Sequence, residues 1–174
     1  GSDTHSISFQ DVIVPKENRI GEDGFGFTFA MKVLSGGRIG IASQALGIAS
    51  GALELAIKYS KERKAFGTEI MNHQAIAFKM ADMATAVEGA RLLCLKSAWE
   101  KDNHINYDVS GAMAKLYASE IAQWVTNEAV QIHGGYGYVK EFHVERLMRD
   151  AKITQIYEGT SEVQKIVISR SLLK

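Results

Sequence analysis

Three long segments of this chain carry apolar residues at helical spacing, and this pattern limits the fold more than any other feature. They run roughly over residues 27–62, 73–101 and 108–133. The second shows a stripe at alternating steps of four and three, formed by Ile76, Met80, Met83, Val87, Ala90 and Cys94. Spacing of this kind predicts long helices that each bury one face.

Shorter helical patterns follow at about 143–153 and 161–173. The paired glycines Gly36-Gly37 are expected to interrupt the first long segment, because glycine lowers helix propensity. Asn72 is a candidate N-cap of the second segment, and Ser161 with Gln164 three residues later fits a capping box. Long helices with short links predict an all-α fold, an up-down four-helix bundle with extra short C-terminal helices.

The single proline, Pro15, separates a different pattern from the helical part. Ser6 to Val14 carries β-branched and aromatic residues in rough alternation, which predicts a strand preceding the bundle. A lone strand cannot form a sheet, so we expect it to be the end of a domain that lies upstream. The predicted division is 1–22 for that domain end and its linker and 23–174 for the helical bundle, with Gly1-Ser2 typical of a cloning remnant.

Composition excludes several classes of partner. The chain has 20 basic and 20 acidic residues, so no strongly basic field is available for nucleic acid or an anionic membrane. We therefore expect neither nucleic acid nor a membrane as partner. The only cysteine, Cys94, lies among apolar residues and is interpreted as a buried thiol. One cysteine also fits a reducing compartment, the cytoplasm of a bacterium or the mitochondrial matrix of a eukaryote.

The sequence does not support a metal site. A carboxylate-bridged di-iron centre in a helical bundle needs Glu-x-x-His pairs. None of the five histidines has a glutamate three positions before it. No phosphate-binding Walker loop or nucleophile elbow is present either.

Four local clusters exceed what a plain bundle needs, although each has a simple structural explanation. Arg63 and Phe66 close the first long segment, where a cation is favoured by the helix dipole but could also hold a diphosphate. His73-Gln74 is a polar helix start whose free N–H groups could receive an anion. The third cluster runs from Gln131 to Tyr138 and contains Gly134-Gly135. These glycines could end a helix or let another molecule approach the backbone.

The fourth cluster is the stretch from Ile156 to Lys165, in which Glu158 precedes Gly159 just before a helix start. The turn holds a carboxylate beside flexible backbone and free amide groups. This is a suitable place for a base that must reach a substrate, although spacing alone gives only a helix start preceded by a glutamate.

Taken together and in this order, these stretches resemble the acyl-CoA dehydrogenase family over nearly the whole chain. The matching segments are 38–49, 63–67, 73–74, 131–138, 147–153 and 156–164, and residues 9–15 resemble the last strand of that family's middle β-domain. The resemblance implies an FAD-dependent oxidoreductase. Such enzymes remove the α-proton of an acyl-CoA thioester while the β-hydride passes to flavin N5.

The resemblance also implies roles for individual residues. Glu158 matches the catalytic base, and its backbone N–H would help to hold the thioester oxygen. The implied cofactor-binding residues are Arg63, Phe66, His73, Gln74, Gln131, Gly134, Gly135, Thr160 and Glu162, and the implied substrate-binding residues are Ser35, Arg38, Tyr157 and Gly159. The site around Gln131, Gly134 and Gly135 matches an FAD site completed by a second subunit.

Two positions bear on the branch of the family. Ser35 is a departure from the short- and medium-chain pattern, because those relatives usually carry an aspartate there, three residues before Arg38. Long-chain and isovaleryl relatives place their base directly before that arginine, where this chain has Gly37. The combination of Gly37 with Glu158 is most similar to the short-chain, butyryl-CoA branch.

Further expectations follow from the same resemblance. The partners are an acyl-CoA substrate, an electron-transfer flavoprotein as acceptor and further copies of the chain in a homodimer or homotetramer. Because the family's N-terminal helical and β-domains are absent from the sequence, we expect a fragment that folds but neither retains FAD well nor turns over substrate. Two other functions stay open: a helical module for oligomerisation or partner binding, and an acyl-CoA oxidase.

Overall fold

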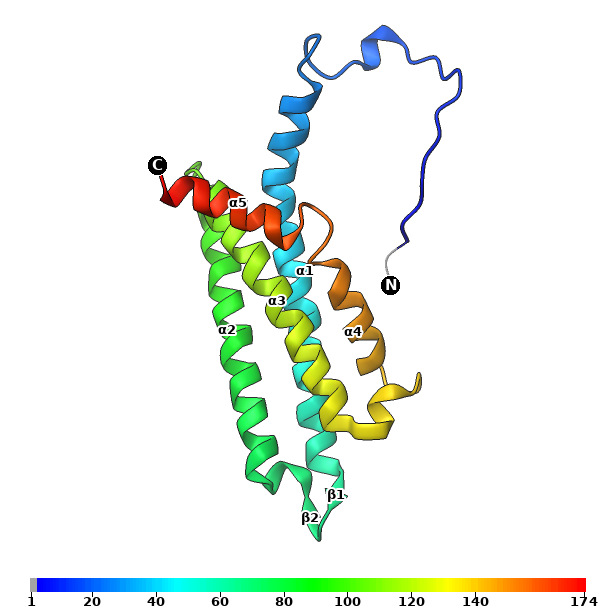
Figure 1. The fold of residues 1–174 in the computed structure, drawn as a ribbon, viewed down its shortest axis with the longest axis vertical. Coiled ribbons are helices and arrows are strands. Elements are labelled where there is room, and N and C mark those ends of the chain that lie inside the picture. The colour runs from blue at the N-terminus through cyan, green and yellow to red at the C-terminus, as the bar shows by residue number, and fades with distance from the viewer. Residues whose placement is uncertain (1–2) are drawn as a thin grey trace.

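The computed structural model describes residues 3–174, so the cloning remnant predicted at Gly1-Ser2 lies outside the described residues. Helices dominate the described chain (Figure 1). The elements in order are the 3-10 helix Lys16–Asn18, α1 (Gly26–Glu62), β1 (Lys64–Ala65), β2 (Thr68–Glu69), the 3-10 helix Ile70–Asn72, α2 (Gln74–Asp102), α3 (Asp108–His133), the 3-10 helix Gly134–Tyr138, α4 (Val144–Ile153) and α5 (Ser161–Leu172).

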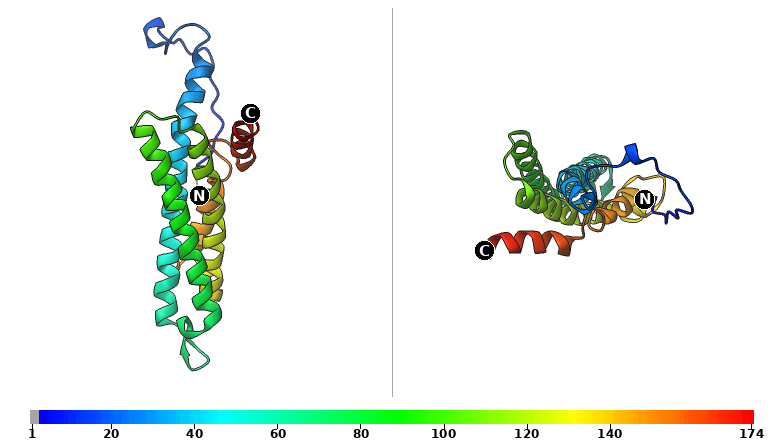
Figure 2. Two further views of the ribbon diagram at one scale, coloured as in Figure 1. Left: turned by 90° about the vertical axis from the view of Figure 1, so that its left-hand side faces the viewer. Right: turned by 90° about the horizontal axis from the view of Figure 1, so that it is seen from above.

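The long helices α1, α2 and α3 lie beside one another and run down, up and down in the view of Figure 1, and the short α4 packs against α1 and α3. Helix α5 crosses the end of this bundle and contacts α3 (Figure 2). The all-α bundle prediction is therefore confirmed, with three long helices and one short one. The five predicted helical segments all correspond to helices.

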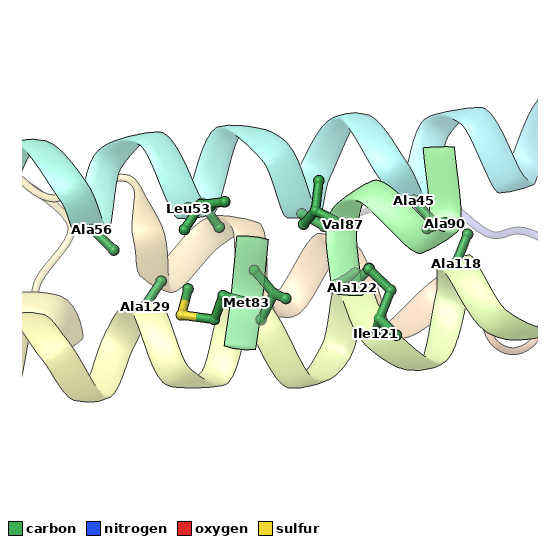
Figure 3. Packing of buried hydrophobic residues seen from close by; sticks show 14 of the residues in the cluster. Ala45, Leu53, Ala56, Met83, Val87, Ala90, Ala118, Ile121, Ala122 and Ala129 are labelled. Carbon is green, nitrogen blue, oxygen red and sulfur yellow. The ribbon is translucent and has the colours of Figure 1, made fainter. Parts of the chain in front are cut away.

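Small side chains bring α1 and α3 close together. On α1 the fully buried alanines recur at steps of three and four, and α3 presents matching alanines to them; the set is Ala42, Ala45, Ala49, Ala52, Ala56, Ala114, Ala118, Ala122 and Ala129. Helix α2 fills the remaining space with larger residues, among them Met83 and Val87 (Figure 3). Because alanine side chains are small, the backbones of α1 and α3 can pack closely where these residues meet.

Helix α1 continues without a break through Gly36-Gly37, so the predicted interruption is wrong. Two glycines cost roughly 2 kcal/mol of helix propensity relative to alanine. Packing on α3 and α2 outweighs that local cost, because most helix stability in proteins comes from tertiary contacts.

The strand predicted over Ser6–Val14 is also wrong, since residues 3–15 have no strand assignment. Within the described chain these residues meet no pairing partner, and Phe9 and Ile13 remain 78% and 93% exposed. Backbone hydrogen bonds of a strand need a second strand, and the described residues supply none here.

Two predicted caps are shifted by one residue. His73, not Asn72, is the N-cap of α2. Thr160, not Ser161, caps α5, and its hydroxyl accepts a hydrogen bond from the Val163 N–H at 3.4 Å. The predicted capping box therefore does not form. Gln164 instead turns its amide toward the preceding turn.

Helix α1 is long and apolar enough, by length and mean hydropathy, to cross a membrane. The core helix of a bundle satisfies the same test, and 39% of its most apolar window is buried inside the molecule. The expectation of no membrane partner stays a prediction.

Candidate active site

The turn between α4 and α5 places Glu158 and Gly159 in the left-handed region, with φ of 54° and 87°. A side chain at such a φ costs about 1–2 kcal/mol, so a non-glycine residue there must be held by its surroundings. The turn projects Glu158 back onto the bundle instead of toward solvent. The Glu158–Gly159 pair predicted from the sequence is therefore a strained, well-defined turn.

The Glu158 carboxylate lies directly over Gly37 of α1. A Cβ placed on Gly37 would come within 2.5 Å of Glu158 Oε2 and 3.1 Å of Cδ. Glu158 Oε2 is buried, and within residues 3–174 it has no hydrogen-bond partner. A buried carboxylate oxygen without a partner is unusual and is free to receive a proton from a bound molecule.

Two fully buried side chains hold the backbone of this turn. Lys115 of α3 donates from Nζ to the Gly159 carbonyl at 2.7 Å. Gln164 of α5 donates from Nε2 to the same carbonyl at 2.8 Å and to the Glu158 carbonyl at 3.3 Å. Burial lowers the pKa of Lys115 to about 8, while the Glu158 and Glu162 carboxylates act to raise it.

Neighbouring predicted residues flank the turn. Tyr157 donates its hydroxyl to Gln44 Oε1 of α1 at 2.5 Å, and burial raises the pKa of this phenol. Arg38, one residue beyond Gly37, has a buried Nε that pairs with nothing in the described residues. Ser35 lines a separate hollow of about 420 Å³ between the first turns of α1 and α3. Ser35, Arg38, Tyr157, Glu158 and Gly159 thus all belong to the same end of the molecule.

The α5 start forms the outer side of this region. Thr160 and Glu162 line a hollow of about 230 Å³ that also contains Lys152 and Lys165. A backbone hydrogen bond, followed by one from the Thr160 side chain, lowers the pKa of Glu162, so this carboxylate is ionised at neutral pH.

A second cluster lies at the opposite end of α1. Arg63, Gly134, Gly135 and Tyr136 line a hollow of about 460 Å³ together with Tyr59, Ile70, Ile132, His133 and Val139. The Arg63 guanidinium lies 5.6 Å from the Tyr136 ring centroid, and no carboxylate in residues 3–174 pairs with it. A Cβ on Gly134 or Gly135 would meet nothing within 4 Å, so these glycines leave open space beside the cation.

This donor set fits the diphosphate of a dinucleotide. An unpaired guanidinium binds phosphate oxygens in a bidentate manner, and open glycine backbone lets phosphate approach its N–H groups. The aromatic floor is rigid, because the Tyr59 and His133 rings stack at 4.2 Å between centroids. His133 also bonds to the Ala129 carbonyl, and burial lowers its pKa so that the ring stays neutral.

The other predicted cofactor residues lie beside this hollow without lining it. Phe66 occupies the loop of the β1–β2 hairpin with Gly67, both at positive φ, and its side chain is 97% exposed. His73 bonds to the Ala65 carbonyl at 3.1 Å and contacts the Phe66 ring edge-on. Gln74 opens α2, and Gln131 lies exposed in the last turn of α3.

The sequence-predicted residues therefore divide into two groups. Gly37, under the Glu158 carboxylate, and Arg63 are about 39 Å apart along α1, at about 1.5 Å of rise per residue. The structure brings each group together but keeps the two groups apart. In residues 3–174 no group of three His, Cys, Asp or Glu side chains could hold a metal ion.

Several residues of the candidate site were missed by sequence reasoning. For Lys115 the sequence offers one indication, a charged residue among the alanines of an apolar helix face. Gln164 was noticed but interpreted as part of a cap. The Tyr59–His133 stack joins α1 to α3 and had no local signal at all.

Comparison with known proteins agrees with this arrangement. The family described as "Acyl-CoA dehydrogenase, C-terminal domain" matches residues 24–173. The chain belongs to the acyl-CoA dehydrogenase family. Two relatives are CarC of Acetobacterium woodii, a subunit of a caffeyl-CoA reductase–Etf complex, at 56% identity over all of this chain, and the bovine mitochondrial short-chain specific acyl-CoA dehydrogenase, at 54% over 99% of it.

A solved acyl-CoA dehydrogenase shows the same fold. Butyryl-CoA dehydrogenase from Megasphaera elsdenii superposes with a TM-score of 0.94 at 55% identity, over 95% of this chain. The resemblance to the short-chain branch is thereby confirmed. The chain spans less than half of these proteins, 46% of CarC, 42% of the bovine enzyme and 43% of the Megasphaera chain.

Proposed function

We propose that this chain is the C-terminal domain of an FAD-dependent acyl-CoA dehydrogenase that oxidises a short-chain acyl-CoA thioester between its α- and β-carbons. The observation that carries the proposal is the Glu158 carboxylate, buried over Gly37 with Oε2 unpartnered. An acceptor oxygen that is held in place and not solvated can remove a proton next to a carbonyl.

The backbone of the same turn supports the second half of the mechanism. Among the described residues, the Glu158 N–H has no hydrogen-bond acceptor. Aimed at a thioester oxygen, this donor would stabilise the negative charge that develops there as the α-proton leaves. Glu158 would thus contribute both its carboxylate as base and its N–H as donor.

Bound FAD would supply the acceptor for the hydride that leaves the β-carbon. The residues of this chain that would hold it are the Arg63 and Gly134-Gly135 hollow for its diphosphate, with Thr160 and Glu162 on the base side. Phe66, His73, Gln74 and Gln131 are proposed as outer contacts, since Phe66, Gln74 and Gln131 are exposed and His73 is half-buried beside Phe66. Ser35, Arg38, Tyr157 and Gly159 are proposed to contact the substrate.

The separation of the two groups supports a shared site between subunits. Gly37 and Arg63 lie about 39 Å apart along one rigid helix. We propose that the base of one copy and the Arg63 hollow of another serve the same cofactor, in a homodimer or homotetramer with closed symmetry. The name of CarC supports an electron-transfer flavoprotein as a partner, which we propose to be the electron acceptor, and the relatives are consistent with either a bacterial cytoplasm or a mitochondrial matrix.

The test is a Glu158→Gln variant of the full-length enzyme, assayed anaerobically by flavin bleaching with butyryl-CoA. Glutamine keeps the shape but cannot accept the proton, so we expect flavin reduction to fall by at least about 10³-fold with little change in substrate binding. A variant that reduces its flavin at the wild-type rate would refute the assignment. Glu88→Gln, the same exchange at an exposed carboxylate on α2, is the matched control and is expected to keep the wild-type rate.

A further inference from the structure

Lys115 is an unusual residue for the interior of a helical bundle. It lies in the middle of α3 and is fully buried, although lysine is almost never buried unless its charge is paired. No carboxylate among the described residues comes within ion-pair distance of its Nζ. Its Nζ instead donates a hydrogen bond to the backbone carbonyl of Gly159 at 2.7 Å.

The charges that face Lys115 come from three elements. Glu158 lies in the turn, Glu162 in the first turn of α5, and Arg38 on α1. Both carboxylates favour the ammonium form of Lys115, and Arg38 disfavours it. A backbone hydrogen bond lowers the pKa of Glu162, and the ammonium group of Lys115 in turn helps to lower it.

The contact also holds strained backbone. Glu158 and Gly159 both have positive φ, and both of their carbonyls accept hydrogen bonds from buried side chains on α3 and α5. Glycine adopts such a φ freely, but at Glu158 it costs about 1–2 kcal/mol and persists only where surrounding contacts fix it. Lys115 and Gln164 are those contacts.

We propose that Lys115 is a positioning residue, a buried cation that fixes the Glu158–Gly159 turn and thereby holds the Glu158 carboxylate over Gly37. The inference rests on the proposed function, because it concerns the same base. It assigns no contact between Lys115 and substrate. Lys115 acts on the turn through its charge and through its hydrogen bond to the Gly159 carbonyl.

Three substitutions in the full-length holoenzyme separate these two effects. Lys115→Met removes both the charge and the hydrogen bond at similar volume. Lys115→Gln removes the charge but retains a donor toward Gly159. Lys115→Arg retains both and serves as the matched control.

The first measurement is the separation of kcat from KM for flavin reduction by butyryl-CoA under anaerobic conditions. With Lys115→Met, we expect kcat to fall at least about tenfold with KM within about twofold of wild type, because the turn that carries Glu158 is no longer held in place. Lys115→Arg is expected to keep kcat close to wild type. A merely structural lysine would lower the folded fraction without changing kcat of the folded holoenzyme.

The second measurement does not depend on turnover. Hydrogen exchange of the peptide covering 155–164 reports how firmly the turn is held. We expect exchange about tenfold faster in Lys115→Met and close to wild type in Lys115→Arg. If Lys115→Met does not fold, Lys115→Gln carries both measurements.

A kcat and an exchange rate unchanged in both neutral variants would overturn the proposal. The outcome is separable from the proposed function. If Glu158→Gln stays active, the assignment of the base fails, whereas the exchange of the turn still shows whether Lys115 holds it.

Discussion

At the scale of single residues, burial decides which ionisable groups are chemically active. The Cys94 thiol is 5% exposed in the core between α2 and its neighbours, and burial raises its pKa to about 11. The thiolate, not the thiol, is the reactive form, so Cys94 is inert at neutral pH. The interpretation of Cys94 as a buried thiol is confirmed.

Cys94 also makes stability depend on pH. Between about pH 9 and 11 the folded thiol keeps a proton that the unfolded thiol loses, so the free energy of unfolding falls as the pH rises. We expect Cys94→Ala to lower stability at pH 8 but to flatten this fall by about 1–3 kcal/mol. Urea unfolding of wild type and Cys94→Ala at several pH values measures this pH dependence of the free energy of unfolding.

Lys115 has the opposite effect on the pH dependence of the free energy of unfolding. Its folded pKa of about 8 lies below the ordinary 10.5, so the unfolded state binds more protons and stability rises over that window. Wild type and Cys94→Ala both contain Lys115. Subtracting their free energies of unfolding at each pH therefore removes the Lys115 contribution. Parallel curves for the two proteins above pH 9 would contradict the account of Cys94.

At the scale of elements, α1 shows how local preference yields to packing. Its glycines predict a break, and yet the helix is continuous because α3 and the turn before α5 pack against it. The two glycines differ in what lies above them. Gly37 faces the Glu158 carboxylate, whereas Gly36 faces the end of the Lys101 side chain, 3.4 Å from a Cβ.

That difference gives a matched pair of variants. Gly37→Ala and Gly36→Ala both raise helix propensity by about 1 kcal/mol, but only the methyl at residue 37 displaces the carboxylate. We expect Gly37→Ala to reduce kcat of the full-length enzyme about 10- to 100-fold with stability maintained, since misplacement by about 1 Å has effects of that size. Gly36→Ala is expected to stay within about twofold of wild type. Equal activities of the two variants would contradict the placement of Glu158.

At the scale of the whole molecule, the bundle acts as a spacer between two chemically distinct ends. The candidate base, Glu158, lies where α5 crosses the bundle, and the hollow beside Arg63 lies near the hairpin at the far end (Figure 1). One rigid helix joins them, so no local motion of a single copy can bring them together. Assembly of copies is the arrangement that the proposed function requires.

Subunit complementation tests that arrangement. If Glu158 and Arg63 of different copies form one site, then mixed dimers of Glu158→Gln and Arg63→Ala contain one intact site and one doubly altered site. Co-expressed in equal amounts, the two inactive variants should recover on the order of a quarter of wild-type activity. Activity equal to the mean of the two separate variants would show that both residues serve a site within one copy.

The sequence by itself determined the helices, the bundle and the family. Helix periodicity is local, so the buried stripes on α2 and α3 could be identified, and exact letters such as those from Ile156 to Gln164 carried the resemblance. Local signals were weaker at the boundaries of elements. The N-cap of α5 is Thr160 and not the predicted Ser161, and the strand predicted over Ser6–Val14 does not form.

Only the tertiary structure decided which distant residues meet. Glu158 lies over Gly37, and Lys115 reaches the Gly159 carbonyl, although the members of each pair are far apart in the chain. Such contacts depend on how α1, α3 and α5 pack, and packing depends on the fit of all buried side chains at once. A periodic pattern shows which face of a helix is buried. It does not show what lies against that face, and the candidate base depends on that contact.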